Sequence, residues 1–127
     1  MDVHKHHKAT CHCGAVELSV LLPEGLKEPC RCDCSLCRRR GTVVVDVDLS
    51  NLSVVEGADA LALYQFNTNT ARHYFCKICG IHTHHQRRSN PKQYSINVGC
   101  LEDINPLQLG PIITFDGINH PSDRNGS

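Results

Sequence analysis

The sequence predicts a mostly β fold in one domain, and three observations favour it. Short segments in which apolar and polar residues alternate recur along the chain, and glycine or proline separates them. No segment has the length and period of an amphipathic helix, although a single helical turn is expected near Pro106 to Leu109. The chain of 127 residues has the length of one domain. We therefore assign one domain to residues 1–127, with an ordered core at about 9–118 and frayed termini.

The expected strands follow from these segments. In chain order they are Val16–Val20, Thr42–Val47, Leu52–Val55, Leu61–Phe66, Thr70–Phe75, Ile81–Gln86 and Tyr94–Val98. The turn Asn67-Thr68-Asn69 joins two of them, which predicts an antiparallel hairpin. Residues 1–10 are polar and are expected to be frayed. With three Phe, three Tyr and no Trp, the core must consist mainly of Val, Leu and Ile.

Charge and cysteine content exclude several classes of protein. Thirteen basic and thirteen acidic residues give no formal net charge, which disfavours nucleic acid and anionic membranes as partners. The nine cysteines are an odd number, and no apolar signal-peptide region or run of about 20 apolar residues accompanies them. These features indicate a cytoplasmic protein whose thiols bind metal rather than form disulfides.

Two cysteine pairs far apart in the sequence suit a closed metal site. Cys11 and Cys13 precede Gly14, and Cys76 and Cys79 precede Gly80, so that each pair lies on a turn that a glycine ends. Gly80 is expected to adopt a positive φ and to direct backbone amides at the sulfurs. Four thiolates bind a structural zinc ion tetrahedrally. The spacing leaves open that Cys11 and Cys13 instead join the central cysteines.

A second cysteine run offers three ligands instead of four. Cys32, Cys34 and Cys37 lie within six residues, too close for a set of disulfides but suited to Zn(II), with Cu(I) or an iron–sulfur cluster as alternatives. A zinc ion held by three thiolates makes bound water a weak acid, so a substrate thiol is the expected fourth ligand and nucleophile. Cys30 is an alternative fourth ligand that would close the site.

Other residues are candidates for assisting roles. Arg38, Arg39 and Arg40 can attract substrate carboxylates or form a solvated basic turn, and the same two interpretations apply to Arg87 and Arg88. One of His82, His84 and His85 can donate a proton. Cys100 is expected to pack in the core. The histidines of the N-terminal tail, His4, His6 and His7, are expected to be solvated.

The cysteine segments, in this order, resemble the glutathione-dependent formaldehyde-activating enzyme family, which includes centromere protein V. The resemblance extends from Cys11 to about Leu101, and further toward Gly117. It rests on Cys11-His12-Cys13-Gly14-Ala15-Val16, Cys32-x-Cys34-Ser35-x-Cys37, Phe66-x-Thr68, Phe75-Cys76-x-x-Cys79-Gly80, Arg88-Ser89-Asn90-Pro91 and Gly99-Cys100-Leu101.

The resemblance implies a β-tent fold with two zinc ions. The structural zinc is expected on Cys11, Cys13, Cys76 and Cys79, and the catalytic zinc on Cys32, Cys34 and Cys37. It also implies a carbon–sulfur lyase that joins glutathione and formaldehyde into S-hydroxymethylglutathione or releases them. The alternative function is a non-enzymatic, zinc-stabilised module that binds a protein partner. Chromatin binding, suggested by the centromere relative, is disfavoured by the balanced charge, and the oligomeric state is left open.

Overall fold

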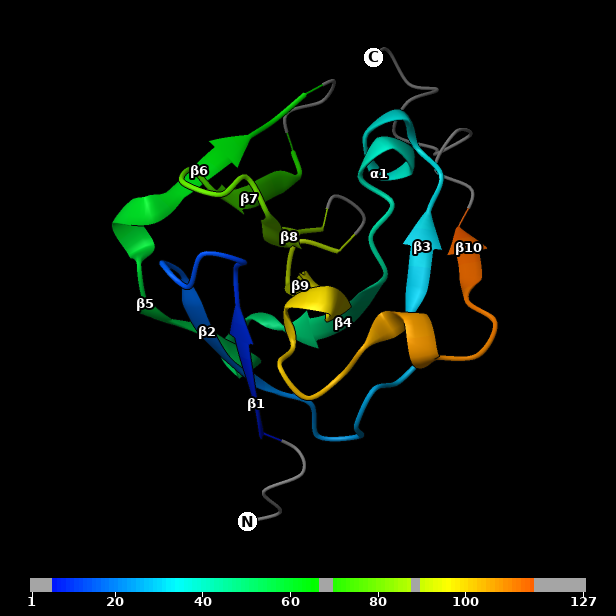
Figure 1. Ribbon diagram of the computed structural model, residues 1–127. Helices are drawn as coiled ribbons and strands as arrows, with labels where there is room; N and C mark the ends of the chain where they lie inside the picture. Colours follow the sequence, from blue (N-terminus) through cyan, green and yellow to red (C-terminus); the bar gives the residue numbers. More distant parts are fainter. Residues whose placement is uncertain (1–5, 67–69, 88–89, 116–127) are drawn as a thin grey trace.

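Two β-sheets make up the fold of the computed structural model, which describes residues 6–66, 70–87 and 90–115 (Figure 1). The smaller sheet has the strand order β1-β2-β5, and the larger has the order β10-β3-β4-β9-β8-β7-β6. Their bounds are β1 His6–Thr10, β2 Glu17–Leu21, β3 Cys30–Cys32, β4 Val44–Asp48, β5 Leu52–Glu56, β6 Leu61–Tyr64, β7 Arg72–Cys76, β8 His82–Gln86, β9 Gln93–Asn97 and β10 Ile113–Phe115. The single α-helix of the described residues, α1, spans Ser35–Arg40.

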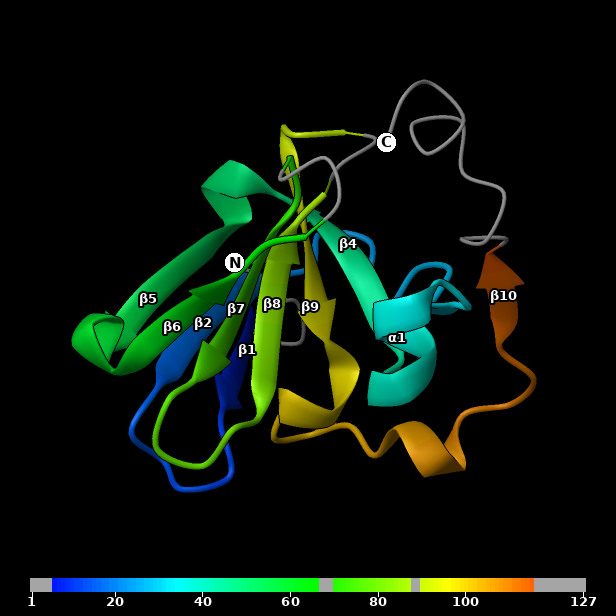
Figure 2. The ribbon, with the colours of Figure 1, turned by 90° about the horizontal axis from the view of Figure 1, so that it is seen from above.

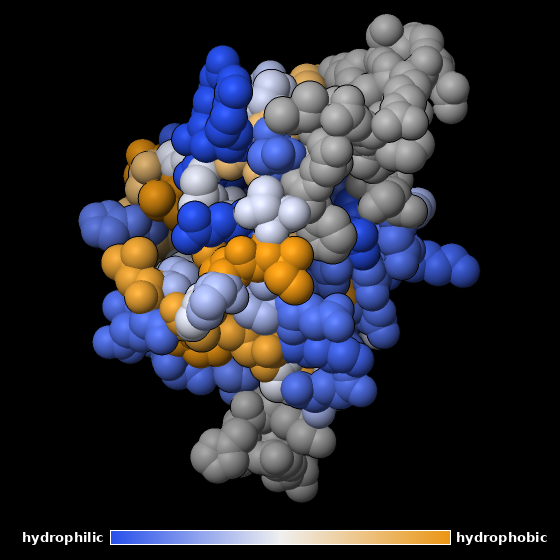
Figure 3. Space-filling view, turned by 90° about the vertical axis from the view of Figure 1, so that its right-hand side faces the viewer, coloured by the Kyte–Doolittle hydropathy of each residue, from blue (hydrophilic) through white to orange (hydrophobic). Residues whose placement is uncertain are grey.

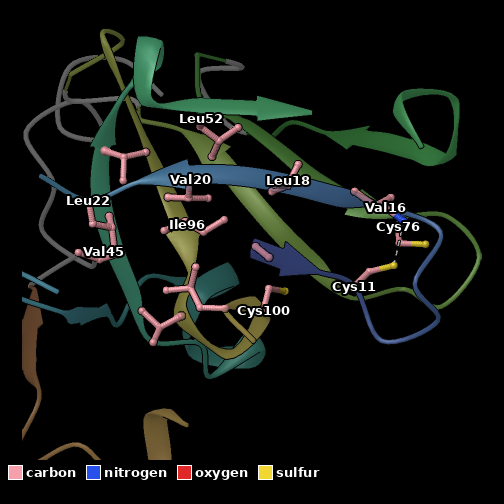
Figure 4. Packing of buried hydrophobic residues seen from close by; sticks show 14 of the residues in the cluster. Cys11, Val16, Leu18, Val20, Leu22, Val45, Leu52, Cys76, Ile96 and Cys100 are labelled. Carbon is pink, nitrogen blue, oxygen red and sulfur yellow. Dashed lines mark hydrogen bonds between the residues drawn. The ribbon is translucent and has the colours of Figure 1, made fainter. Parts of the chain in front are cut away.

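The core lies between the two sheets. Leu18 and Val20 of β2 are at most 1% exposed, as are Val45 of β4 and Ile96 of β9. Figure 4 shows these side chains pointing toward one another from β2 on one side and from β4 and β9 on the other. Figure 2, the view from above, shows the strands of the larger sheet following one another from β6 to β9 and β4, with α1 beyond them. Burial of branched aliphatic side chains from both sheets therefore holds the sheets together.

The structure confirms the mostly β fold class, and every expected strand is present with small shifts at its ends. β6 and β7 pair antiparallel, with Leu61 opposite Cys76, as the hairpin prediction requires. The turn expected at Asn67–Asn69 lies outside the described residues. The helical turn expected near Pro106 is also present, as the 3-10 helix Pro106–Gln108. Within the described ranges, no helix is long and apolar enough to cross a membrane.

The prediction that residues 1–10 are frayed is wrong for residues 6–10. They form β1, which pairs antiparallel with β2 along its whole length. Ala9 is the one buried residue of this strand, and the others are polar. The strand therefore shows no alternation of apolar and polar residues that would predict it. Lys8 accepts a backbone hydrogen bond from Glu102, and His7 lies 2.9 Å from the Asp103 carboxylate. Long-range contacts of this kind are invisible in the local sequence.

The connection predicted before the central cysteines instead contains β3, which has neighbours on both sides. β3 pairs with β4 and, in parallel, with β10, so that Ile113 lies opposite Cys30 and Phe115 lies opposite Cys32. Strands of three residues are too short to show alternation. Figure 3 shows the side of the molecule that carries β10, where apolar surface lies among hydrophilic side chains. Leu107 and Ile113 are the exposed apolar side chains of this segment, at 87% and 65%.

Gly57, just after β5, packs directly on the chain next to the first cysteine pair. Its φ is +82°, and a Cβ atom there would lie 1.9 Å from the carbonyl oxygen of Ala15. Gly25 has a similar φ of +70° but no atom within 4 Å of such a Cβ. An alanine at Gly25 therefore causes backbone strain alone, whereas an alanine at Gly57 causes backbone strain and a steric clash.

We predict that Gly57→Ala destabilises the metal-loaded protein by more than about 2 kcal/mol, because it adds a backbone clash to the cost of a positive φ. The control Gly25→Ala should cost about 1 kcal/mol, the φ strain alone. Urea denaturation of both variants measures the difference. Equal losses of unfolding free energy would contradict the contact of Gly57 with Ala15.

Candidate metal centres

Four cysteines from two distant turns meet at one point. The sulfur atoms of Cys11, Cys13, Cys76 and Cys79 all lie within 4.8 Å of one another. Cys13 Sγ is 3.6 Å from Cys11 Sγ and 3.7 Å from Cys76 Sγ. A tetrahedron with metal–sulfur bonds of 2.3 Å, as zinc forms, has sulfur–sulfur edges of about 3.8 Å. The group thus fits one ion, and Cys11 and Cys13 do not join the central cysteines.

Backbone turns hold these four sulfurs in place. Gly14 and Gly80 have φ values of +83° and +80°, and the positive φ expected for Gly80 is confirmed. The Gly80 N–H donates to the Cys76 carbonyl at 2.7 Å, and the Val16 N–H donates to Cys11 Sγ at 3.3 Å. Figure 4 shows Cys11 and Cys76 with their sulfurs side by side at the edge of the core, with Cys76 fully buried. The group therefore links the turn before β2 to the turn after β7.

The second group contains the three central cysteines. Cys32 ends β3, Cys34 caps α1 and Cys37 lies in the helix, and their sulfur atoms lie within 4.8 Å of one another. The Cys37 N–H donates to Cys34 Sγ at 3.3 Å, so the sulfur serves as the helix N-cap. Gly41 ends the helix with a φ of +68°. The helix was not expected, because six residues are too few to show its period.

The three sulfurs influence one another's ionisation strongly. Hydrogen bonds from the Cys32 and Cys37 side chains lower the pKa of the Cys34 thiol. The neighbouring sulfurs of Cys32 and Cys34 in turn raise the pKa of Cys37. One thiolate therefore forms readily, and further negative charge at this point needs a cation. Such a donor set fits a soft or borderline metal ion.

Cys30 lies apart from this group. It is buried in β3, at 7% exposure, and is not among the sulfurs that converge with Cys34. Burial, and then the Asp46 carboxylate, raise the pKa of Cys30 to about 11, so it stays a neutral thiol. In the described part of the chain, the central group thus has three potential ligands and no fourth cysteine, histidine or carboxylate.

Of the three arginines after the central cysteines, one turns inward. Arg38 and Arg39 are exposed, and Arg39 donates to the Ser35 carbonyl of its own helix. Arg40 is half-buried, with Nη1 3.5 Å from His73 Nδ1. Burial lowers the pKa of Arg40, while the Cys37 and Cys34 sulfurs raise it, so these sulfurs lie within the range of its charge. Arg38 and Arg39 are therefore solvated, whereas the side chain of Arg40 is directed toward the central cysteines.

A hollow of about 490 Å³ lies between α1 and the strands β7 and β8. Leu36 and Arg40 line it from the helix side, and Phe75 and His82 from the strands. Leu36 and Arg40 belong to the same short helix as Cys37, although none of the three central cysteines lines the hollow itself. Apolar walls with one guanidinium suit a small organic molecule that carries a negative charge.

The histidines of β8 divide into two kinds. His84 is buried between Tyr74 and Tyr94 and contacts Thr83 Oγ1 at 2.8 Å, which indicates a packing role. His82 and His85 instead face His73 of β7, which the sequence analysis did not single out. Burial lowers the pKa of His85 to about 3 and of His84 to about 4, so neither is charged at neutral pH. The assignment of a proton donor among these three histidines stays a prediction.

Two other expectations concern single residues. Cys100 is 5% exposed and belongs to the hydrophobic core, as predicted, and its thiol donates to the His82 carbonyl. Arg87 contacts the Asp46 carboxylate at 3.2 Å and Gln93 Oε1 at 2.6 Å. These contacts give Arg87 a structural role within the sheet. Arg88 lies outside the described residues.

The fold and cysteine pattern have counterparts among known proteins. The family model described as glutathione-dependent formaldehyde-activating enzyme matches residues 6–115. A crystal structure of a Rhodobacter sphaeroides protein, a structural genomics target, has 56% sequence identity and a TM-score of 0.82; the match covers 85% of this chain and 99% of that one. The family match spans both cysteine groups and every described strand. This chain belongs to the glutathione-dependent formaldehyde-activating enzyme family.

Proposed function

We propose that this protein is a zinc-dependent carbon–sulfur lyase that acts on a glutathione-type thiol and a small aldehyde such as formaldehyde. In the forward direction the thiol sulfur bonds to the carbonyl carbon, and the carbonyl oxygen takes up a proton. The product is the S-hydroxymethyl thioether, and the reverse reaction releases thiol and aldehyde. Family membership supports this reaction class. The nine free thiols suit a reducing compartment, and we propose the cytoplasm.

The convergence of Cys32, Cys34 and Cys37 carries the proposal. The three sulfurs would hold an ion at three corners of a tetrahedron, and among the described residues no further cysteine, histidine or carboxylate converges with them to take the fourth corner. When bound there, zinc supplies a positive centre that lowers the pKa of a thiol at that corner and so raises its thiolate fraction. Cys11, Cys13, Cys76 and Cys79 offer a full set of four ligands, so a second zinc at that group is structural.

The chain's own residues supply the remaining requirements. The hollow beside α1 is large enough for part of a tripeptide thiol, and the helix that lines it also carries Cys37. Arg40, which lines it, offers a guanidinium to a substrate carboxylate. Leu36 and Phe75 offer apolar surface to the carbon chain of the substrate. Charge recognition and apolar contact therefore come from different sides of one hollow.

A non-enzymatic protein-binding module is the second candidate. The observation in its favour is the exposure of Leu107 and Ile113 on the face shown in Figure 3. That face contains β10, whereas the hollow is lined by residues of α1 and of the strands β6 to β9. Thiol binding at the central cysteines distinguishes the two functions, because a protein-binding module does not require it.

We predict that removal of the metal from the four-cysteine group unfolds the protein. Structural zinc contributes about 10 to 16 kcal/mol in small domains, as much as the whole stability of such a chain. Cys76→Ser should therefore abolish the cooperative thermal transition, whereas Cys34→Ser in the central group should keep it. Far-UV circular dichroism and calorimetry measure this, and a cooperative transition after complete demetallation would contradict the structural role.

Replacement of a central cysteine should abolish thiol binding. Cys34→Ser is expected to reduce the zinc content from two ions to one and to abolish glutathione binding in calorimetry, with the fold retained. The matched control is Cys30→Ala, a neighbouring cysteine outside the group, which should retain two zinc ions and bind glutathione. Loss of one zinc ion in Cys30→Ala would mean that Cys30 is a ligand, and the proposed open corner would then not exist.

Arg40 should contribute to the affinity for the substrate. Loss of one charge-assisted hydrogen bond costs about 1.5 to 3 kcal/mol, so Arg40→Met should weaken glutathione binding by roughly 10- to 100-fold. Arg38→Met, an exposed arginine of the same helix, should change it less than about twofold. Titrations at two salt concentrations test this. Equal effects of the two variants would show that Arg40 does not contact the thiol substrate.

A further inference from the structure

Three histidines from two strands form a cluster separate from both cysteine groups. His73 of β7 and His82 and His85 of β8 each offer a ring nitrogen, and these nitrogens lie within 4.8 Å of one another. We propose that the cluster is a third metal site, which binds a divalent ion such as Zn(II) or Co(II) through three imidazoles. This proposal does not depend on the lyase function proposed above.

The distance between two of the rings matches that of ligands on one ion. His85 Nδ1 is 3.3 Å from His82 Nε2. Two nitrogens bound tetrahedrally to zinc at 2.0 to 2.1 Å are separated by about 3.4 Å. The ring of His73 lies across from both, with its centroid 4.8 Å from that of His85 and 6.5 Å from that of His82. A small rotation of the His73 ring brings its nitrogen into the same coordination sphere.

The cluster is buried and has one polar atom without a hydrogen bond. His73 and His82 are 5% and 6% exposed, and His82 Nδ1 has no hydrogen-bond partner among the described atoms. A neutral imidazole has one N–H and one lone pair. When His82 Nε2 donates to His85, the lone pair of His82 Nδ1 is left unpaired in an apolar environment, which is costly. A metal ion does not bind this atom, because the nitrogens that converge are His82 Nε2 and His85 Nδ1; it binds the lone pairs of both, so that neither has to carry a proton toward the other.

The strands fix the arrangement before any ion binds. His73 lies directly opposite His85 in the antiparallel pair of β7 and β8, so both side chains are on one face of the sheet. His82 reaches the same face through the irregular register between Tyr74 and Phe75. Burial lowers the pKa of His82 and His85 and keeps these two rings neutral, which is the form that binds metal. Ligands that rigid strands position lose little entropy when an ion binds.

Arg40 determines what completes the coordination. Its guanidinium lies 3.5 Å from His73 Nδ1, and this positive charge opposes a bare divalent ion. An ion that carries a hydroxide or another small anion as its fourth ligand has a lower charge, and the anion can accept a hydrogen bond from Arg40. Three imidazoles with one exchangeable ligand are typical of zinc sites that activate water. The site therefore binds an ion together with an anion.

The test is Co(II) titration of full-length protein already loaded with two equivalents of zinc. We expect one further equivalent to bind with visible absorption of a tetrahedral nitrogen site and without sulfur-to-cobalt charge transfer. His82→Leu and His85→Gln should weaken this binding by at least about 100-fold, because removal of a ligand costs more than loss of a supporting contact. Arg40→Met should remove the dependence of the affinity on added anions.

Two control variants separate this site from other sources of binding. His84→Phe changes a buried histidine of the same strand outside the cluster, and His4→Gln combined with His6→Gln changes the histidine tail. Both should bind the third ion as the parent protein does. Loss of binding in the tail variant alone, charge transfer from sulfur, or no third equivalent would each overturn the proposal.

A measurement on the unmodified protein makes the test independent of whether the variants fold. Addition of a third equivalent of zinc should shift the ring nitrogen resonances of His73, His82 and His85 and leave those of His84 unchanged. Shifts confined to other histidines would overturn the proposal.

Discussion

The mutual repulsion of crowded thiolates is the constraint on which the rest of this structure depends. Seven sulfurs gather in two groups, each within 4.8 Å, and negative charge accumulates there only if a cation is present. The four-cysteine group joins a turn at the start of β2 to a turn at the end of β7, which places both sheets around one point. The hydrophobic core begins at the same place, because Cys11 and Cys76 are themselves buried. The converging sulfurs and the apolar packing thus meet at one point in a chain with few aromatic residues.

Local patterns in the sequence were sufficient for much of the fold and of the site. Alternation gave the longer strands, and the glycine after each outer cysteine pair gave its turn, because both signals depend on neighbouring residues alone. The short elements β3, β10 and α1 were not predicted, because three to six residues are too few to show a period. His73 was not predicted as a site residue for another reason. Its partners are on the next strand, and only the register of β7 with β8 brings them together. Arg40 could not be distinguished from Arg38 and Arg39 in the sequence, because only its direction on the helix α1 differs and that helix was not predicted.

Arg40 couples parts of the molecule that the sequence separates. Its charge is within range of the sulfurs of Cys34 and Cys37, and its guanidinium also approaches His73. A half-buried cation in this position stabilises thiolates on one side and keeps imidazoles uncharged on the other. The hollow that it lines also includes His82 of the histidine cluster. The end of one short helix therefore sets the electrostatic character of the whole region.

The parallel pairing of β10 with β3 has a consequence for how the protein forms. The strand that carries Cys32 receives its second neighbour only from residues 113–115, and the turn with Cys11 receives its partners only from residues 76–79. A ribosome releases the early cysteines long before these later segments exist. Nascent chains therefore carry the early cysteines for an interval without their final neighbours, and the four-cysteine group can form only after residues 76–79 have been made.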